Sequence, residues 1–193
     1  MQTFKALLKE VRNCQICAQA LPHAPRPVVQ IDPAAKILIA GQAPGRKVHA
    51  SGIPFDDASG VRLREWMGIS REQFYDPSQV AILPMGFCYP GAGKSGDLEP
   101  RRECAPAWRE ALLAQLGQLQ LTLVIGQYAQ RYHLTQNNLN VSETVAAWRD
   151  CGPNILPLPH PSPRNNIWLS RNPWFAKELI PVLQQRVQAA LSG

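Results

Sequence analysis

Residues 36–45 (KILIAGQAPG) place a short apolar run directly before a loop that contains two glycines and a proline. The apolar run is typical of a strand that is buried on both faces. The glycines and the proline permit a tight turn whose backbone amides approach a ligand closely, although a plain strand-to-helix turn explains the loop equally well. The loop is neither a GxGxxG motif nor a P-loop, so we expect no nucleotide cofactor.

Further apolar runs follow along the chain, separated by stretches with a helical pattern. The predicted strands are 36–40 (KILIA), 80–83 (VAIL), 121–125 (LTLVI) and 154–158 (NILPL). The predicted helices are 60–67, 102–116, 127–132 and 174–191, the last kinked or divided by Pro181. This alternation predicts an α/β fold: a three-layer α/β/α sandwich with a central, mainly parallel four-stranded sheet. With no repeats and no long linker, residues 1–193 form a single domain.

The composition is that of a globular protein, with 45% hydrophobic and 18% charged residues. No apolar run approaches the ~20 residues of a membrane helix. The N-terminal stretch MQTFKALLKEVRNC has a helical period and is unlike a secretory signal, so we expect a cytoplasmic protein. The net charge of +6 and the pI near 9.3 favour an acidic partner such as nucleic acid.

Three loops follow predicted strands and carry the polar and stiff residues. They are 41–45 (GQAPG), 84–90 (PMGFCYP) and 160–166 (HPSPRNN). Because the carboxyl ends of parallel strands share one edge of a sheet, we expect these loops to converge on a pocket.

Two of these loops, together with residues 52–55 (GIPF), resemble the defining motifs of the uracil-DNA glycosylase superfamily. The loop GQAPG after the first strand and the loop HPSPRN after the last strand stand in the family's order. The resemblance runs from the N-terminal cysteines to Trp174. It implies that the protein excises uracil or another deaminated or damaged base from DNA in base-excision repair, by hydrolysis of the N-glycosidic bond and as a monomer.

The resemblance also implies roles for single residues. His160 would stabilise the negative charge on the departing base, and Phe55 would stack on the flipped base. Arg164 would fill the gap that the flipped nucleotide leaves, while Ser162 and neighbouring amides would grip phosphates. The predicted substrate-binding residues are Gly41, Ala43, Pro44, Gly45, Phe55, Met85, Gly86, Ser162, Arg164 and Asn165.

The sequence departs from the family pattern at two points. A carboxylate that orients the attacking water often stands where this chain has Ala43, so Gln42 is a candidate polar contact. Asp56 and Asp57 are the nearest carboxylates, either as water-orienting groups or as helix caps. The iron–sulfur class has a base-reading asparagine where this chain has Pro84, so recognition would fall to backbone amides around residues 85–87, or the substrate is a base other than uracil.

The segment 91–97 (GAGKSGD) reads as an insert after the second strand. It carries Lys94, which would touch a DNA phosphate or help to close the loop over the base. A plain surface loop is the alternative. For three other side chains we expect modest roles: a surface position for His49, packing under the 160–166 loop for Trp168, and a core or free thiol for Cys151.

Cys14, Cys17, Cys88 and Cys104 form a C-x2-C and a C-x15-C pair, which supplies four thiolates for a metal. Zinc or simple buried thiols are consistent with the residues alone. The family resemblance favours a structural [4Fe–4S] cluster, because the iron–sulfur class (family 4) has this spacing.

Two other functions remain open. A catalytically weak relative would recognise a modified base in nucleic acid without cleaving it. An unrelated α/β hydrolase would use Ser162 or Cys88 as nucleophile, but the sequence has no G-x-S-x-G elbow.

Overall fold

The computed structural model describes residues 3–94, 96–134 and 139–193. Its centre is a four-stranded sheet in the order β2-β1-β3-β4, and every pair of neighbouring strands is parallel. The strands are β1 (Ile37–Ala40), β2 (Val80–Ile82), β3 (Leu121–Ile125) and β4 (Ile155–Leu158). All four predicted strands are therefore confirmed, with ends within one residue of the predicted ones.

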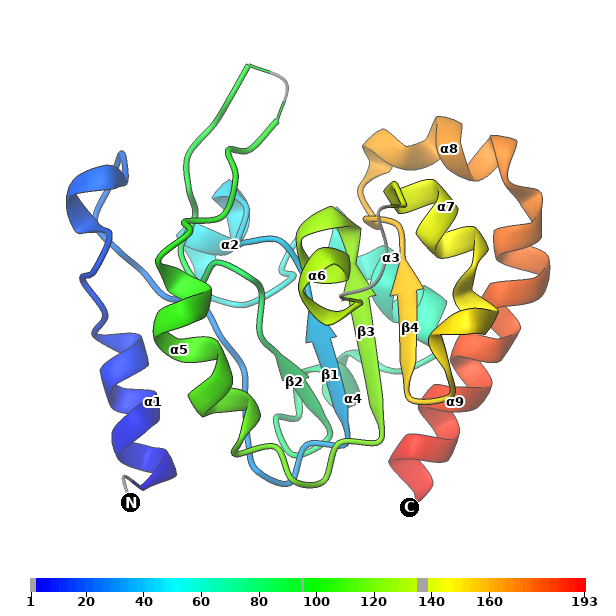
Figure 1. Ribbon diagram of the computed structural model, residues 1–193, viewed down its shortest axis with the longest axis horizontal. Helices are drawn as coiled ribbons and strands as arrows, with labels where there is room; N and C mark the ends of the chain where they lie inside the picture. The colour runs from blue at the N-terminus through cyan, green and yellow to red at the C-terminus, as the bar shows by residue number, and fades with distance from the viewer. Residues whose placement is uncertain (1–2, 95, 135–138) are drawn as a thin grey trace.

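Helices cover both faces of the sheet, which confirms the predicted three-layer α/β sandwich (Figure 1). They are α1 (Phe4–Arg12), α2 (Arg46–Ser51), α3 (Ala58–Met67), α4 (Arg71–Tyr75), α5 (Cys104–Leu113), α6 (Gly126–His133), α7 (Val141–Ala146), α8 (Asn166–Arg171) and α9 (Ile180–Ser192). None of the helices in the described residues has the length and apolar character of a membrane span.

Alternation along the strands determines which helices lie on each face. In β1, Ile37 and Ile39 pack in one cluster with residues of α3, α4 and α9. Leu38 lies on the opposite face in a cluster with residues of α1 and α5. Side chains of successive strand residues point to opposite faces, and both faces here are apolar, as expected of a strand covered on both sides.

The last helical stretch is divided, as Pro181 predicts. Residues Phe175–Leu179 form a π-helical turn, and α9 begins at Ile180 with the proline in its first turn. The division is a change of hydrogen-bond pattern within continuous helical backbone, and the π-helical turn just before Pro181 accommodates a residue without an N–H. Leu179, Leu183 and Val187 follow one another on the buried side, so the division leaves the apolar face continuous.

The strand order places the functional loops together. The chain passes from β1 to β2 on one side and later to β3 on the other side of β1. At such a switch point the loops beyond the carboxyl ends of the strands separate and leave a crevice for a ligand. In Figure 1 all four strands point toward the edge where the 91–97 insert and α8 lie.

Candidate active site

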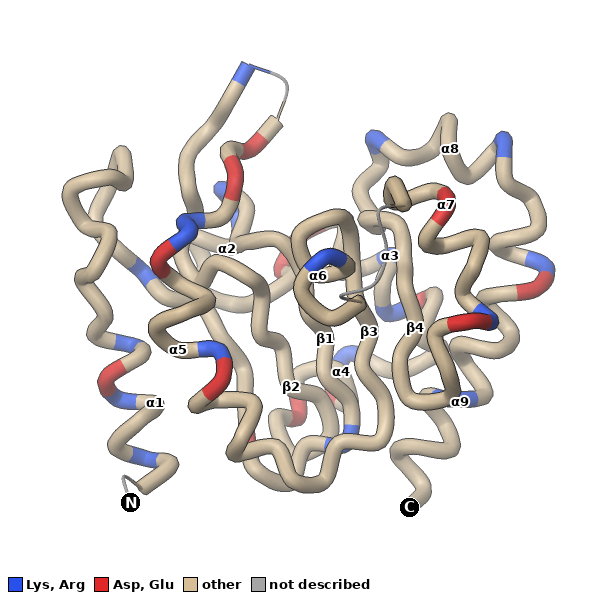
Figure 2. The backbone as a smooth tube through the Cα atoms, viewed as in Figure 1, with Lys and Arg blue, Asp and Glu red and all other residues tan. Residues whose placement is uncertain are grey.

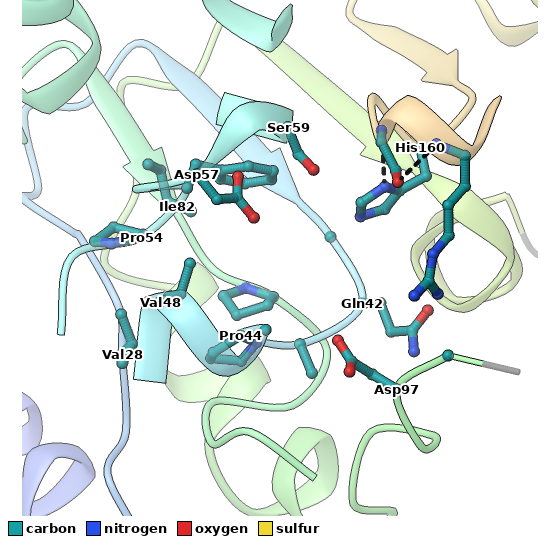
Figure 3. Close-up of a pocket in the computed structure, with 18 of the residues that line it drawn as sticks. Val28, Gln42, Pro44, Val48, Pro54, Asp57, Ser59, Ile82, Asp97 and His160 are labelled. Carbon is teal, nitrogen blue, oxygen red and sulfur yellow. Dashed lines mark hydrogen bonds between the residues drawn. The ribbon is translucent and has the colours of Figure 1, made fainter. Parts of the chain in front are cut away.

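A cavity of about 480 Å³ lies at the carboxyl edge of the sheet, within the range of small-ligand pockets. The three loops predicted to converge all contribute to it. Of the predicted residues it is lined by Gly41, Gln42, Ala43, Pro44, Gly45, Phe55, Asp57, His160, Ser162, Arg164 and Asn165. Figure 3 shows His160 and Gln42 on one side of this cavity and Val28, Pro54 and Val48 on the other.

His160 follows β4 directly and faces the cavity. Its Nδ1 atom accepts a hydrogen bond from the Ser162 backbone N–H at 3.2 Å. Burial lowers the pKa of the imidazole, while Asp57 and Asp97 act in the opposite direction. A neutral ring that accepts at Nδ1 carries its proton on Nε2. His160 therefore offers the cavity a neutral N–H donor.

The 160–165 loop is rigid through its own hydrogen bonds. The Asn165 side-chain amide donates to the His160 carbonyl at 2.6 Å, and the Asn165 backbone N–H donates to the Ser162 carbonyl at 2.9 Å. From α3, the Arg62 guanidinium donates to the same Ser162 carbonyl at 3.1 Å. Together with the two prolines, these bonds leave little conformational entropy to lose when the loop meets a ligand.

Phe55 occupies the left-handed region with φ of 54°, which a bulky side chain rarely adopts. The conformation depends on Gly60, because a Cβ at that position would lie only 1.8 Å from the Phe55 carbonyl oxygen. The ring lies near Gly41 and meets Phe74 edge-on, with ring centroids 6.1 Å apart. Strained residues that line a cavity are typical of functional sites, so the structure supports Phe55 as a ligand contact.

The two candidate carboxylates have different surroundings. Asp57 caps α3 through a 2.9 Å hydrogen bond from the Gly60 N–H, and its carboxylate also points into the cavity (Figure 3). Asp56 does not line the cavity and instead pairs with Arg71 at 3.6 Å. Asp57 is therefore both a helix cap and a cavity group, and Asp56 is neither a cap nor a lining residue.

The loop after β2 differs from the expectation. Pro84 lines the cavity, but Met85 and Gly86 do not. The Met85 and Gly86 N–H groups donate to the carbonyls of Gly41 and Gln42, at 2.8 and 2.9 Å. The Phe87 N–H donates to Cys104 Sγ at 3.3 Å. We expected these three backbone amides to recognise the base, but their N–H groups are already bonded within the protein. They connect the β2 loop to the first loop and to Cys104.

A buried arginine supports the same loop from below. Arg109 of α5 donates to the Leu83 and Pro84 carbonyls at 2.9 and 3.1 Å and contacts His133 Nε2 at 2.7 Å. Burial lowers the pKa of Arg109 to about 10 and, with the arginine's charge, that of His133 to about 4. Neither residue was predicted to have a role, since a charged residue among apolar helix positions carries no sign of its partners.

The 91–97 insert contributes a cavity residue that was not predicted from the sequence. Its two arms pair at Ala92 and Asp97, and Asp97 lines the cavity mouth. Leu98 accepts a hydrogen bond from the Gln42 side-chain amide at 3.2 Å. The Arg164 guanidinium lies 3.0 Å from where a side chain on Gly96 would begin. Of the insert, Ser95 lies outside the described residues, and the predicted contact of Lys94 stays a prediction.

The four cysteines of the predicted metal site come together around a second, small cavity. Cys14 and Cys17 follow α1, Cys88 follows β2, and Cys104 begins α5. The Trp108 indole N–H donates to Cys14 Sγ at 3.2 Å. Burial raises the pKa of Cys88 to about 11 and that of Cys104 to about 12, and the neighbouring thiols contribute in the same direction.

These cysteines suit soft metal chemistry in type and number, and N–H groups aimed at sulfur are the kind of contact that tunes a thiolate ligand. Among the residues described, no group of three or more His, Cys, Asp or Glu side chains is disposed as ligands of a single metal ion. A four-iron cluster binds each cysteine at a different iron, so its four ligands need not meet at one point.

Three further expectations have clear outcomes. His49 is only partly exposed: its ring packs beside the stacked rings of His23 and Tyr89, with centroids 4.0 and 6.0 Å away, and burial lowers its pKa. Trp168 packs as expected, but against other partners: its ring meets Trp174 and Phe175 edge-on. Cys151 is a free, partly buried thiol, also as expected.

Basic side chains gather at the edge that carries the cavity. Figure 2 shows them on the insert, on α2 and α6, and at both ends of α8. The exposed cations of this edge are Arg46, Lys47, Lys94, Arg131, Arg164 and Arg171. A positive surface around a cavity attracts an anionic polymer and guides it toward the site.

The family model described as "Uracil DNA glycosylase superfamily" matches residues 28–184. The match includes the first loop, the Phe55 segment, the β2 loop and the 160–165 loop. The chain belongs to this superfamily. Members of the superfamily generally act on DNA, and the matched region contains every residue that lines the large cavity.

Proposed function

We propose that the protein is a DNA glycosylase that excises uracil or another deaminated or damaged base in base-excision repair. The observation that carries the proposal is the neutral His160, whose Nε2–H faces a cavity lined by the strained Phe55. A glycosylase needs a stacking surface for the flipped base and a donor where charge develops on it. Both groups lie in this cavity.

In the proposed reaction the flipped base stacks on Phe55 while its N-glycosidic bond breaks. The bonding electrons leave with the base, and its anion accepts a hydrogen bond from His160 Nε2–H. A neutral donor is suited to this buried position, since it stabilises the anion without the cost of burying a charged imidazolium. Water, which Asp57 would orient, then attacks the sugar carbon, and the proton that it loses passes to the departed base anion, so that an abasic sugar and a neutral base remain.

The surroundings of the cavity are suited to DNA. Arg164 stands at the mouth on a rigid loop and would fill the space that the flipped nucleotide vacates. The exposed cations around it would contact phosphates without reading sequence. We propose that the protein does this as a monomer in the cytoplasm.

We also propose that Cys14, Cys17, Cys88 and Cys104 hold a [4Fe–4S] cluster. A cluster bound there would cross-link the segment after α1, the β2 loop and α5, which is a structural contribution. Through Arg109, α5 in turn holds the Leu83 and Pro84 carbonyls at the cavity wall.

The experiment is a panel of oligonucleotides that each carry one lesion. Strand breakage after alkali treatment reports excision, and a gel shift reports binding. Excision of at least one base that is lost in His160→Ala supports the proposal. A gel shift without breakage for every base would overturn it and favour a relative that recognises a modified base without cleaving it.

A further inference from the structure

The large cavity has a polar mouth and an apolar inner end. Asp97 and Arg164 are exposed at the mouth, whereas Val28, Val48 and Ile82 at the inner end are almost fully buried. Figure 3 shows Val28, Ile82, Pro54, Val48 and Pro44 together on the side away from His160, Gln42 and Asp97. Pro84, which stands where the family has its base-reading amide, also lines the cavity and follows Ile82 by two residues.

Backbone groups around the inner end are already used. The Val28 N–H donates to the Phe87 carbonyl at 2.7 Å, and Gln30 pairs with both the N–H and the carbonyl of Ile82. The Pro84 carbonyl accepts from Arg109, and proline has no N–H to offer. These groups cannot turn to a ligand without losing bonds within the protein.

The nearest polar side chains along the wall are Asp57 and Ser59 (Figure 3). The Asp57 carboxylate only accepts hydrogen bonds when ionised, and one of its oxygens is held by the Gly60 N–H. The leading edge of uracil carries a carbonyl oxygen next to an N–H. Where this edge meets the side chains of Val28, Ile82 and Pro84, neither group finds a hydrogen-bond partner, which weakens binding.

We infer that the cavity selects bases whose leading edge is alkylated, a substrate class that rests on the proposed glycosylase function. A methyl group or a fused apolar ring in place of the edge N–H would pack against Val28, Ile82 and Pro84. The oxygen beside the glycosidic nitrogen, which collects charge as the base departs, would remain free for His160.

The test compares 2′-deoxyuridine with N3-methyl-2′-deoxyuridine, which differ by one methyl group at the leading edge. Each is placed opposite an abasic site in the same duplex, so that neither base is paired and the cost of flipping does not differ. Single-turnover excision by the wild-type protein should be roughly tenfold or more faster for the methylated base, the usual value of one methyl group in an apolar pocket.

Two variants examine the wall itself. Pro84→Asn restores an edge-reading amide and should reduce the preference for the methylated base at least ~tenfold, by speeding uracil excision. Pro84→Ala removes the ring without adding a polar group and should keep the preference. Excision of uracil as fast as the methylated base by the wild-type protein would overturn the inference.

Affinities for the same duplexes separate this inference from the proposed function. Should neither base be excised, a preference for the methylated duplex of about tenfold still supports the apolar edge, while the glycosylase proposal loses support. Equal affinities with no excision would count against both.

Discussion

The backbone N–H of Ser162 donates to Nδ1 of His160 at 3.2 Å, so the loop that would meet DNA also fixes the proton of the histidine. Asn165 completes the arrangement by donating to the His160 carbonyl at 2.6 Å. A displacement of this loop would therefore alter both the orientation and the tautomer of the ring. The stiffness of the HPSPRNN stretch would thus serve the proposed chemistry as well as the proposed docking of DNA.

His160→Ala should reduce the single-turnover excision rate by about a hundredfold to a thousandfold, which corresponds to about 2.7–4 kcal/mol for the loss of one donor to a developing anion. The interaction is strongest in the transition state, so the dissociation constant for damaged DNA should change little. His49→Ala, which removes a histidine outside the cavity, should leave the rate near that of the wild type. A normal rate in His160→Ala would remove the histidine from the mechanism.

Asp57→Asn should lower the excision rate by about a hundredfold or more, if the carboxylate orients the attacking water. The asparagine oxygen can still accept from the Gly60 N–H, so helix α3 should remain capped and the midpoint of unfolding nearly unchanged. Asp56→Asn is the matched control, since Asp56 pairs with Arg71 outside the cavity. Equal rates in the two variants would assign Asp57 to capping alone.

The fold was predictable because its strands are buried on both faces and each is followed by a glycine or proline. A short, largely apolar run such as LTLVI favours a parallel strand that is covered by helices on both faces. The strand β3 has the predicted ends. The short helix α2 was missed, because six residues with Lys47 and His49 show no clear apolar period.

The site was predictable where a residue belongs to a motif, as His160 and Phe55 do. It was not predictable where the role depends on packing between distant segments. Asp97 reaches the cavity because the insert folds back over Gly45, and the Met85 amide is engaged because the first loop lies against it. No local pattern in either segment indicates these partners.

The cysteine cavity predicts a coloured protein. Purified without oxygen, it should be brown and contain iron and sulfide, as expected of four thiolates around a cluster. Cys88→Ser or Cys104→Ser should lose the colour and lower the thermal midpoint, because each removes one cross-link between segments. Cys151→Ser should keep both, since that thiol lies elsewhere. A colourless wild-type protein that contains stoichiometric zinc would contradict the proposed cluster and indicate a zinc site.

Arg164→Ala should weaken binding to DNA that contains a flipped base more than it slows excision from the bound complex. The guanidinium stands at the cavity mouth, where it would fill the vacated space in the duplex. Arg171→Ala, at the far end of α8, removes an equal charge and should lower affinity for damaged and undamaged DNA alike. Equilibrium binding of both duplexes at one salt concentration distinguishes the two. If both variants lost affinity for the two duplexes equally, Arg164 would be only a phosphate contact.

The contact between Arg109 and His133 predicts a stability that falls with acid. The pKa of His133 is lowered from 6.5 to about 4 by burial and by the arginine, so the unfolded chain binds the proton more readily than the folded one. The contribution of neutral His133 to the free energy of unfolding is fully present above pH 6.5 and is lost as the pH falls toward 4. Denaturant unfolding should show a loss of about 2 kcal/mol from this group between about pH 7 and pH 5.

His133→Gln isolates that loss, because its side-chain oxygen can still accept from Arg109 but does not titrate in this range. The free energy of unfolding of the variant should decline less than that of the wild type, by about 2 kcal/mol over the same pH interval. Arg109→Met should be severely destabilised at every pH, since the Leu83 and Pro84 carbonyls lose their donor. If the wild type and His133→Gln declined in parallel, the histidine would be protonated at the same pH in both states, and the buried contact would contribute nothing to the acid sensitivity.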